Sequence, residues 1–346
     1  MLLICFGTRP ELIKLIPVIN IYEKKKIEFK LLFTGQHPDL IKDFYKYING
    51  RDIIELKDIM DKNQTLNKLS SKILYKIDNI FDNLKISKVM VQGDTTTAFI
   101  VALSAFNRKI KIIHLEAGLR TNNRHSPYPE EMNRRMISQI ADIHLCPTKR
   151  AVENLRKELI TKNVYLVGNT IVDVFNEINS STTPPKNLKS IIDKNLNYKL
   201  VTLHRRENRG KKIEEMWGQL NELSKRETFI YITHPSLPES KSILNERIII
   251  LEPQNYENMV HLINNSDGII TDSGGLQEEA VCANKKVLVC RDTTERPETI
   301  ECGLGKLINI NIINNIDFFN KKLNILENPY GNNVSEKIYN ILLKIN

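Results

Sequence analysis

The 346-residue sequence lacks several features that would place it in a specialised class of protein. Its longest apolar runs, such as residues 98–103, are far shorter than the roughly 20 residues of a membrane-spanning helix. The start, MLLICFG, has no basic leader and no small-residue cleavage site, so we expect no signal peptide. Aromatic residues amount to 7%, and they are not interleaved with basic residues as in nucleic-acid-binding proteins. We therefore expect a cytoplasmic protein that binds neither membrane nor nucleic acid.

Cysteine is also scarce, and its pattern predicts no metal site. The sequence has five cysteines, Cys5, Cys146, Cys282, Cys290 and Cys302. Their number is odd, and their spacings match no zinc-binding pattern. Cys5 and Cys290 lie within apolar runs, where cysteine behaves as a small hydrophobic residue. This usage is typical of the reduced thiols of a cytosolic protein.

Composition and charge are those of a globular protein with a basic excess. Hydrophobic residues make up 41% and charged residues 26%, and the length suggests two domains at about 150 residues each. The formal net charge is +9, with many lysines scattered as in the stretch 23–26. A basic excess of this kind favours an anionic ligand without identifying it.

Apolar runs alternate with amphipathic stretches along both halves of the chain. The predicted strands are residues 2–6, 29–33, 88–92, 111–115, 143–146 and 164–167, then 199–203, 228–232, 247–251, 268–271 and 286–290. Residues 11–22 have the apolar spacing of a helix, and residues 317–345 also look helical, with a break near 329–331. The polar stretch 179–185 is the best linker candidate. The alternation predicts an α/β protein with parallel sheets covered by helices on both faces.

Charged and polar residues follow several predicted strands, where ligands of parallel sheets bind. Those of the first half are Arg9, Asp94 and Glu116, with Glu130 close behind, and those of the second half are His204, His234 and the stretch 272–275. Three carboxylates at one sheet edge favour general acid–base catalysis, which is worth about 10²–10⁴-fold in rate. Each alone could instead cap a helix, as Asp94 could before its three threonines. Lys14 lies in the first turns of its helix and is either solvated or directed at this edge.

The stretch 272–279, DSGGLQEE, follows a strand and opens a helix. Gly274 and Gly275 let a ligand approach the backbone, and the free N–H groups of a helix start after Ser273 favour phosphate. This pattern suits the binding of a nucleotide diphosphate, although an ordinary tight turn capped by Asp or Ser would have the same sequence pattern. Glu279, one turn further on, is placed to accept ribose hydroxyls.

Arginines near two other strand ends are candidates for binding the same diphosphate. Arg296 lies in the stretch 291–298, and a guanidinium pairs bidentately with phosphate oxygens. The alternative for this stretch is a surface ion-pair loop. His204 would usually be structural as a lone histidine, but Arg205 and Arg206 beside it favour a position facing phosphate.

Taken together, these motifs resemble those of the non-hydrolysing UDP-N-acetylglucosamine 2-epimerases. The matching stretches are FGTRPE (6–11), TGQH (34–37), QGDTTT (92–97), HLEAGLRT (114–121), SPYPEEMNR (126–134), VGNT (167–170), HRREN (204–208), DSGGLQEE (272–279) and TERPE (294–298). They cover nearly the whole chain in the order of the family.

The resemblance implies a GT-B-like fold, in which two Rossmann-like domains have parallel sheets facing a central cleft that holds UDP. Residues 1–169 would form the first domain, with a C-terminal helix at about 331–346 packing back on it, and residues 170–330 the UDP-binding domain. It also implies a homodimer that uses neither a metal nor a nicotinamide cofactor.

The resemblance further implies a reaction and a set of residue roles. UDP would be eliminated from UDP-N-acetylglucosamine to leave 2-acetamidoglucal, and its re-addition would give UDP-N-acetylmannosamine, a precursor for surface polysaccharide. Asp94, Glu116, Glu130 and His204 align with the catalytically important residues of the family, and Arg134 with a supporting arginine. Arg9 and Lys14 match positions near the sugar and phosphates, and Ser273, Gly274, Gly275, Glu279 and Arg296 match UDP contacts.

The sequence departs from the family at positions that belong to an activator site for a second UDP-N-acetylglucosamine. Pro38-Asp39 stands where many bacterial members have a basic residue and a glutamine, and Asn63 stands where they often have an arginine. The resemblance therefore does not carry activation by substrate over to this chain. Four other functions stay open: a hydrolysing 2-epimerase, the same reaction on a diacetamido uronate or fucosamine-type UDP-sugar, a GT-B glycosyltransferase, and a UDP-sugar sensor. A sensor would be expected to lose one of the three carboxylates, and a glycosyltransferase would need an acceptor groove.

Overall fold

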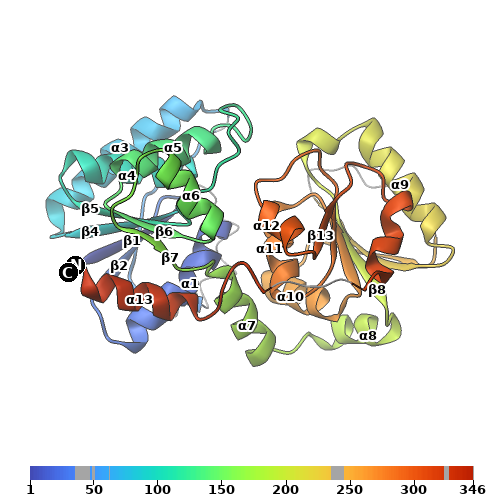
Figure 1. Cartoon of the computed structure of the whole chain (residues 1–346). Helices are drawn as coiled ribbons and strands as arrows, with labels where there is room; N and C mark the ends of the chain where they lie inside the picture. Colours follow the sequence, from blue (N-terminus) through green and yellow to red (C-terminus); the bar gives the residue numbers. More distant parts are fainter. Residues whose placement is uncertain (36–46, 49–50, 62, 235–244, 323–326, 346) are drawn as a thin grey trace. The chain divides into compact units, whose positions relative to one another are not determined.

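The computed structural model describes residues 1–35, 47–48, 51–61, 63–234, 245–322 and 327–345. These residues form two units, Met1–Val174 with Tyr330–Asn346, and Phe175–Pro329 (Figure 1). Each unit is built on a parallel sheet, so the α/β class predicted from the sequence is confirmed. Within the described residues, no helix combines the length and the apolar character needed to cross a membrane.

The sheet of the first unit has the strand order β3-β2-β1-β4-β5-β6-β7 within the described residues. These strands are β1 (Leu2–Phe6), β2 (Phe29–Phe33), β3 (Ile53–Glu55), β4 (Lys88–Gln92), β5 (Lys111–Leu115), β6 (Ile143–Cys146) and β7 (Val164–Leu166). Five of them have the predicted bounds, and β7 is one residue shorter than predicted. The sequence pattern missed β3 because this edge strand has only three residues, none of them buried.

Helices cover both faces of this sheet, with α3, α4 and α5 on one face and α1 with α13 on the other (Figure 1). The helices of this unit are α1 (Arg9–Lys24), α3 (Leu66–Asn83), α4 (Thr96–Asn107), α5 (Glu130–Ile140), α6 (Lys149–Lys157) and α13 (Val334–Lys344), and α7 (Ile171–Ser181) begins in the first unit and ends in the second. The helix predicted at 11–22 lies within α1, which starts earlier because Thr8 and Glu11 form a capping box. Glu11 accepts hydrogen bonds from the backbone N–H groups of Gly7 (3.0 Å) and Thr8 (2.7 Å).

The end of the chain belongs to the first unit. The ring of Tyr339 on α13 packs edge-on against Tyr22 of α1, with centroids 6.2 Å apart. Before α13, the backbone N–H of Asn169 donates to the carbonyl oxygen of Tyr330 at 2.9 Å. Gly168 has φ +104°, and a Cβ there would lie 2.4 Å from that same oxygen, so only glycine permits this close approach.

The second unit repeats the arrangement with the strand order β10-β9-β8-β11-β12-β13 within its described residues. Its strands are β8 (Tyr198–Thr202), β9 (Thr228–Ile232), β10 (Ile248–Leu251), β11 (Gly268–Thr271), β12 (Val287–Val289) and β13 (Gly305–Leu307). Its helices are α8 (Lys186–Lys194), α9 (Lys211–Leu223), α10 (Tyr256–Asn265), α11 (Gly274–Cys282) and α12 (Pro297–Glu301), with 3₁₀ helices at Arg206–Asn208 and Ile313–Asn320. Trp217 of α9 is buried and donates to the Tyr231 hydroxyl at 3.2 Å.

Two sequence predictions in this region were wrong in part. The stretch 179–185 is not all linker, because α7 continues to Ser181 and the chain leaves the helix only before the two prolines that precede α8. The tail 317–345 is not one helix with a short break. A 3₁₀ helix ends at Asn320, and α13 begins only at Val334.

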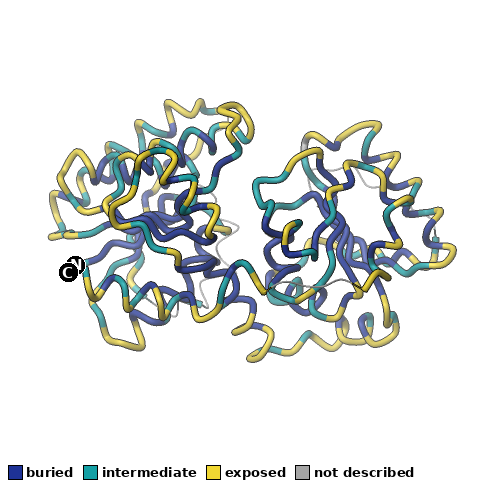
Figure 2. The backbone as a smooth tube through the Cα atoms, in the orientation of Figure 1, coloured by how far each residue is buried: buried dark blue, intermediate teal, exposed yellow. Residues whose placement is uncertain are grey.

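Both sheets reverse their strand order next to their first strand, between β1 and β4 and between β8 and β11. The strands at these points are buried, as Figure 2 shows by the dark tubes at the centre of each unit. A reversal of this kind leaves a crevice at the carboxyl ends of the two strands, where ligands of α/β proteins bind. Residues 7–9 and 93–94 follow the first pair of strands, and residues 203–204 and 272–273 follow the second pair.

Candidate active site

Glu116, directly after β5, is a buried carboxylate held by two side chains. The Lys14 ammonium of α1 lies 2.8 Å from both carboxylate oxygens, and the Gln92 amide at the end of β4 donates to Oε2. Lys14 and Glu116 are only 8% and 9% exposed, so each supplies the charge that makes burial of the other tolerable. Glu116 also has φ +65°, a left-handed conformation that is uncommon outside glycine and that clusters at functional sites.

Asp94, at the carboxyl end of neighbouring β4, forms an ion pair with Arg134 of α5. The backbone oxygen of Asp94 accepts a hydrogen bond from the Asn133 side chain at 2.9 Å. Glu130, the first residue of α5, precedes Arg134 by about one helical turn. Arg9 is the first residue of α1 and is half-buried. The first unit thus supplies two carboxylate–cation pairs at the ends of adjacent strands.

A neutral histidine supports the loop that carries Asp94. Burial lowers the pKa of His114 on β5 to about 3, and the Nε2–H of this imidazole donates to the Gly93 carbonyl oxygen 2.8 Å away. His144, its register partner on β6, has its pKa lowered to about 4, also by burial. Both imidazoles are therefore uncharged at neutral pH.

In the second unit, fully buried Asp272 ties the end of β11 to the end of β8. It accepts hydrogen bonds from the backbone N–H groups of His204 and Arg205, each at 3.0 Å, and from the Asn208 amide at 2.9 Å. The Arg205 guanidinium lies 3.3 Å from Glu207. Asp272 therefore fixes the backbone that carries the candidate histidine and arginine.

His204 is held between a carboxylate and a second imidazole. Its Nδ1 is 3.5 Å from Asp272, and its ring stacks on His234 with centroids 4.7 Å apart. Burial lowers the pKa of His204, Asp272 opposes this effect, and His234 and Arg205 add to it. At neutral pH the ligand-free imidazole is therefore uncharged and offers a hydrogen bond rather than a positive charge.

The start of α11 has the geometry expected of an anion-binding helix end. Ser273 is the N-cap residue, and its side chain makes no capping hydrogen bond. A Cβ at Gly275 would meet nothing within 4 Å, so this side of the first turn is open. A Cβ at Gly274 would lie 2.6 Å from Nη1 of Arg296, which shows that the guanidinium packs directly on the helix start. The first N–H groups of a helix have no partners within it.

Two carboxylates, the buried Glu278 and the half-buried Glu295, hold the Arg296 guanidinium in this place. Its Nε lies 2.8 Å from Glu278, and its Nη1 donates to Glu295. Burial opposes ionisation of Glu295, but Arg296 and Arg291 outweigh it and hold the pKa of this carboxyl at about 2. Burial and the neighbouring Glu279 of α11 raise the pKa of the phenol of Tyr256, the first residue of α10.

The structure pairs Lys14 with Glu116, Asp94 with Arg134, and Arg296 with the start of α11. Residues that complete these arrangements but received no role from the sequence are Gln92, Glu131, Asp272, Glu278 and Glu295. Of these, only Gln92 and Asp272 carried a signal, as polar residues at strand ends. Of the motif TGQH, Gln36 and His37 lie outside the described residues, as do Pro38 and Asp39.

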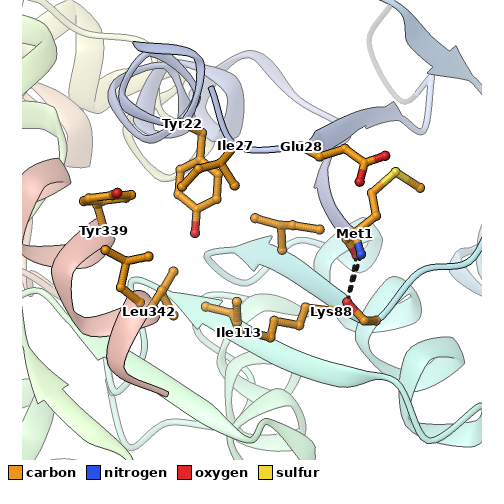
Figure 3. A pocket seen from close by; sticks show the side chains of 11 residues that line it. Met1, Tyr22, Ile27, Glu28, Lys88, Ile113, Tyr339 and Leu342 are labelled. Atoms are coloured by element: carbon orange, nitrogen blue, oxygen red, sulfur yellow. Dashed lines mark hydrogen bonds between the residues drawn. The ribbon is translucent and has the colours of Figure 1, made fainter. Parts of the chain in front are cut away.

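The opposite edge of the first sheet has a cavity of about 170 Å³ between α13 and the amino ends of β1 and β4 (Figure 3). Its lining includes Leu2, Tyr22, Lys88, Tyr339 and Leu342, and none of the candidate site residues. Within the described ranges, no three His, Cys, Asp or Glu side chains are grouped so that they could hold a metal ion.

Known proteins are similar to this chain in sequence and in fold. The model of the family described as UDP-N-acetylglucosamine 2-epimerase matches residues 20–343. The chain belongs to the UDP-N-acetylglucosamine 2-epimerase family. A Campylobacter jejuni member of this family is 39% identical over 99% of this chain and 97% of its own length. This membership confirms the resemblance predicted from the motifs and makes the chain an isomerase.

Solved structures of the family match 99% of this chain. The 2-epimerase from Neisseria meningitidis, bound to UDP-GlcNAc, has a TM-score of 0.87 and 36% identity over 99% of both chains. The enzyme from Methanocaldococcus jannaschii, in complex with UDP-GlcNAc and UDP, has a TM-score of 0.85 and 34% identity, again over 99% of both. These similarities confirm the GT-B-like fold class with two Rossmann-like halves.

Proposed function

We propose that this family member interconverts UDP-N-acetylglucosamine and UDP-N-acetylmannosamine without releasing free sugar. The observation that carries the proposal is the pair of carboxylate–cation contacts at adjacent strand ends, Lys14 with Glu116 and Arg134 with Asp94. The relatives that bind UDP-GlcNAc support the choice of substrate. The family relationship also supports a homodimer, a cytoplasmic location and a supply of N-acetylmannosamine units for surface polysaccharide.

Inversion at C2 of this sugar needs an elimination, because C2 is not next to a carbonyl group. The C1–O bond breaks and its electron pair leaves with UDP. A carboxylate removes the C2 proton, and the electrons of the C2–H bond form the C1=C2 double bond of 2-acetamidoglucal. In the reverse sense, a proton is added to C2 on the other face, and a phosphate oxygen of UDP re-forms the bond to C1.

The two faces of the sugar require two proton-handling groups. Asp94, Glu116 and Glu130 are the candidates in the first unit. Lys14 and Arg134 hold Glu116 and Asp94 in place, and a fixed position is what proton transfer needs. Arg9 is proposed to face the sugar and phosphates beside them. A placed general base or acid contributes about 10²–10⁴-fold in rate.

The second unit would stabilise UDP as the leaving group. The backbone N–H groups of Gly274 and Gly275, in the turn that begins at Ser273, and the Arg296 guanidinium match the negative charge that develops on the diphosphate. Neutral His204 would donate a hydrogen bond, with Arg205 beside it, and Glu279 would accept from the ribose hydroxyls. Residues 1–169 with 331–346 would act on the sugar, and residues 170–330 would bind UDP.

Incubation with UDP-N-acetylglucosamine in heavy water, followed by NMR, tests this function. The expected product is UDP-N-acetylmannosamine with deuterium at C2 and little free sugar. Free N-acetylmannosamine with an equal amount of UDP would show a hydrolysing enzyme instead. If the sugar does not react, the substrate assignment is wrong, and other UDP-2-acetamido sugars become the ones to assay.

A further inference from the structure

Glu131, the neighbour of Glu130 in α5, is a fully buried carboxylate with four hydrogen-bond donors. Its Oε2 accepts from the backbone N–H of Thr121 at 2.9 Å and from Nη1 of Arg134 at 3.3 Å. Its Oε1 accepts from Nε of Arg135 at 3.0 Å and from the backbone N–H of Asn122 at 3.2 Å. Burial raises the pKa of Glu131, but these donors and the Arg134 charge outweigh burial and lower it. Glu131 is therefore ionised at neutral pH.

The Arg134 guanidinium is shared between Glu131 and Asp94. Nη1 meets Glu131, and Nη2 forms the ion pair with Asp94. Its third nitrogen, Nε, is buried and has no hydrogen-bond partner among the described residues. The planar guanidinium is thus oriented by one carboxylate on each side, and Glu131 is the one anchored to the backbone of another segment.

We propose that Glu131 is a positioning residue for the epimerase reaction, because it fixes the plane of Arg134 and thereby the Asp94 carboxylate. This role rests on the proposed function of Asp94 in proton transfer. Glu131 itself would not touch the sugar, since it is fully buried and its oxygens are occupied by donors from Thr121, Asn122 and α5.

A nearby carboxylate provides a matched control. Glu158 accepts from Arg120 at 2.8 and 2.7 Å and lies 3.4 Å from Arg135, so it belongs to the same network of charges. Among the residues that the structure describes, its hydrogen-bond and ion-pair partners are Arg120 and Arg135, and Arg134 is not one of them. Glu131 and Glu158 therefore share Arg135 as a partner, and they differ in whether they contact the guanidinium that meets Asp94.

The test compares Glu131→Gln with Glu158→Gln in the full-length enzyme. Glu131→Gln should lower kcat by about 10²-fold, the typical cost of displacing a reacting group by about 1 Å, with little change in KM. Glu158→Gln should lower Tm and leave kcat unchanged. If both variants lower Tm but neither lowers kcat, Glu131 is only structural and the proposal is wrong. If Glu131→Gln does not fold, Glu131→Asp, which keeps the charge but withdraws it by one methylene, should show the same loss of kcat.

A double-mutant cycle separates positioning from general damage. In an Arg134→Met background, Glu131→Gln should cause almost no further loss of kcat, because the residue through which it acts is gone. If the loss of kcat in the double variant equals the product of the two single-variant losses, the proposal is wrong.

A readout without turnover separates this proposal from the proposed function. If the wild-type enzyme does not exchange the hydrogen at C2 of UDP-N-acetylglucosamine, the proposed function is wrong. The NMR signals of the Arg134 guanidinium then decide the positioning role of Glu131. They should shift or broaden in Glu131→Gln and stay unchanged in Glu158→Gln. Unchanged signals in Glu131→Gln would rule out the anchoring role whatever the activity.

Discussion

The replacement Lys14→Met tests whether the buried ion pair between Lys14 and Glu116 stabilises the first unit. Methionine has nearly the volume of lysine, so packing changes little, but the Glu116 carboxylate loses its ammonium while staying 9% exposed. Removing one partner of a buried ion pair typically lowers the free energy of unfolding by about 3–5 kcal/mol. The hydrogen bond from Gln92 to Glu116 remains, so we expect a loss of about 3 kcal/mol here.

Urea denaturation followed by far-ultraviolet circular dichroism measures this loss. Lys72→Met is the control in the same unit, because Lys72 pairs with the exposed carboxylate of Asp61 at 2.7 Å, and such pairs contribute about 0–1 kcal/mol. The double variant Lys14→Met/Glu116→Gln should recover part of the loss. The reasoning is refuted if Lys14→Met costs no more than Lys72→Met, or if the double variant is less stable than Lys14→Met alone.

Three further predictions concern catalysis, pH and the C-terminal segment. Asp94→Asn and Glu116→Gln should each lower C2 deuterium exchange by about 10²–10⁴-fold and leave UDP binding measurable; wild-type exchange in both would remove their assigned roles. Since the pKa of folded His144 is about 4 and that of unfolded histidine about 6.5, the unfolded chain binds more protons between these values. The free energy of unfolding should therefore fall as pH decreases through this window, by up to about 1.4 kcal/mol per pH unit from this residue. Urea titrations at several pH values should give His144→Gln a smaller slope of unfolding free energy against pH than the wild type. Equal slopes would contradict the prediction. Gly168→Ala should lower Tm more than Gly93→Ala, because both have positive φ but only the Cβ at 168 would meet a backbone oxygen, at 2.4 Å; equal shifts would contradict this.

The sheet cores could be predicted from the sequence because their strands are continuous apolar runs. Residues 2–6 and 111–115 are buried on both faces of the sheet except at Lys111, and a run of this kind leaves little ambiguity in its bounds. Edge strand β3 and the last strand, β13, escaped notice because each has only three residues, with little burial to impose a pattern. The order of the strands was not predicted, because apolar runs do not indicate which strands are neighbours in a sheet.

Some features of the candidate site could likewise be predicted from the sequence, and others could not. Residues directly after strands, such as Asp94 and Glu116, could be found because the chain must turn there at one edge of a parallel sheet. Lys14 and Arg134 were among the predicted site residues, but their pairing could not be predicted, because Lys14 lies 102 positions away from Glu116 and Arg134 lies 40 positions away from Asp94. Glu131 was hidden for another reason, since a glutamate one position after another reads as an exposed charge until the fold buries it.

The position of Trp217 provides an intrinsic fluorescence probe of how the two units unfold. It is the single tryptophan of the chain and lies in the core of the second unit, bonded to Tyr231. Tryptophan emission therefore follows the loss of the second core alone, whereas circular dichroism follows helices and strands of both units. Coincident transitions in the two signals would mean that the halves unfold as one cooperative system, and separated transitions would give each half its own stability without any added label.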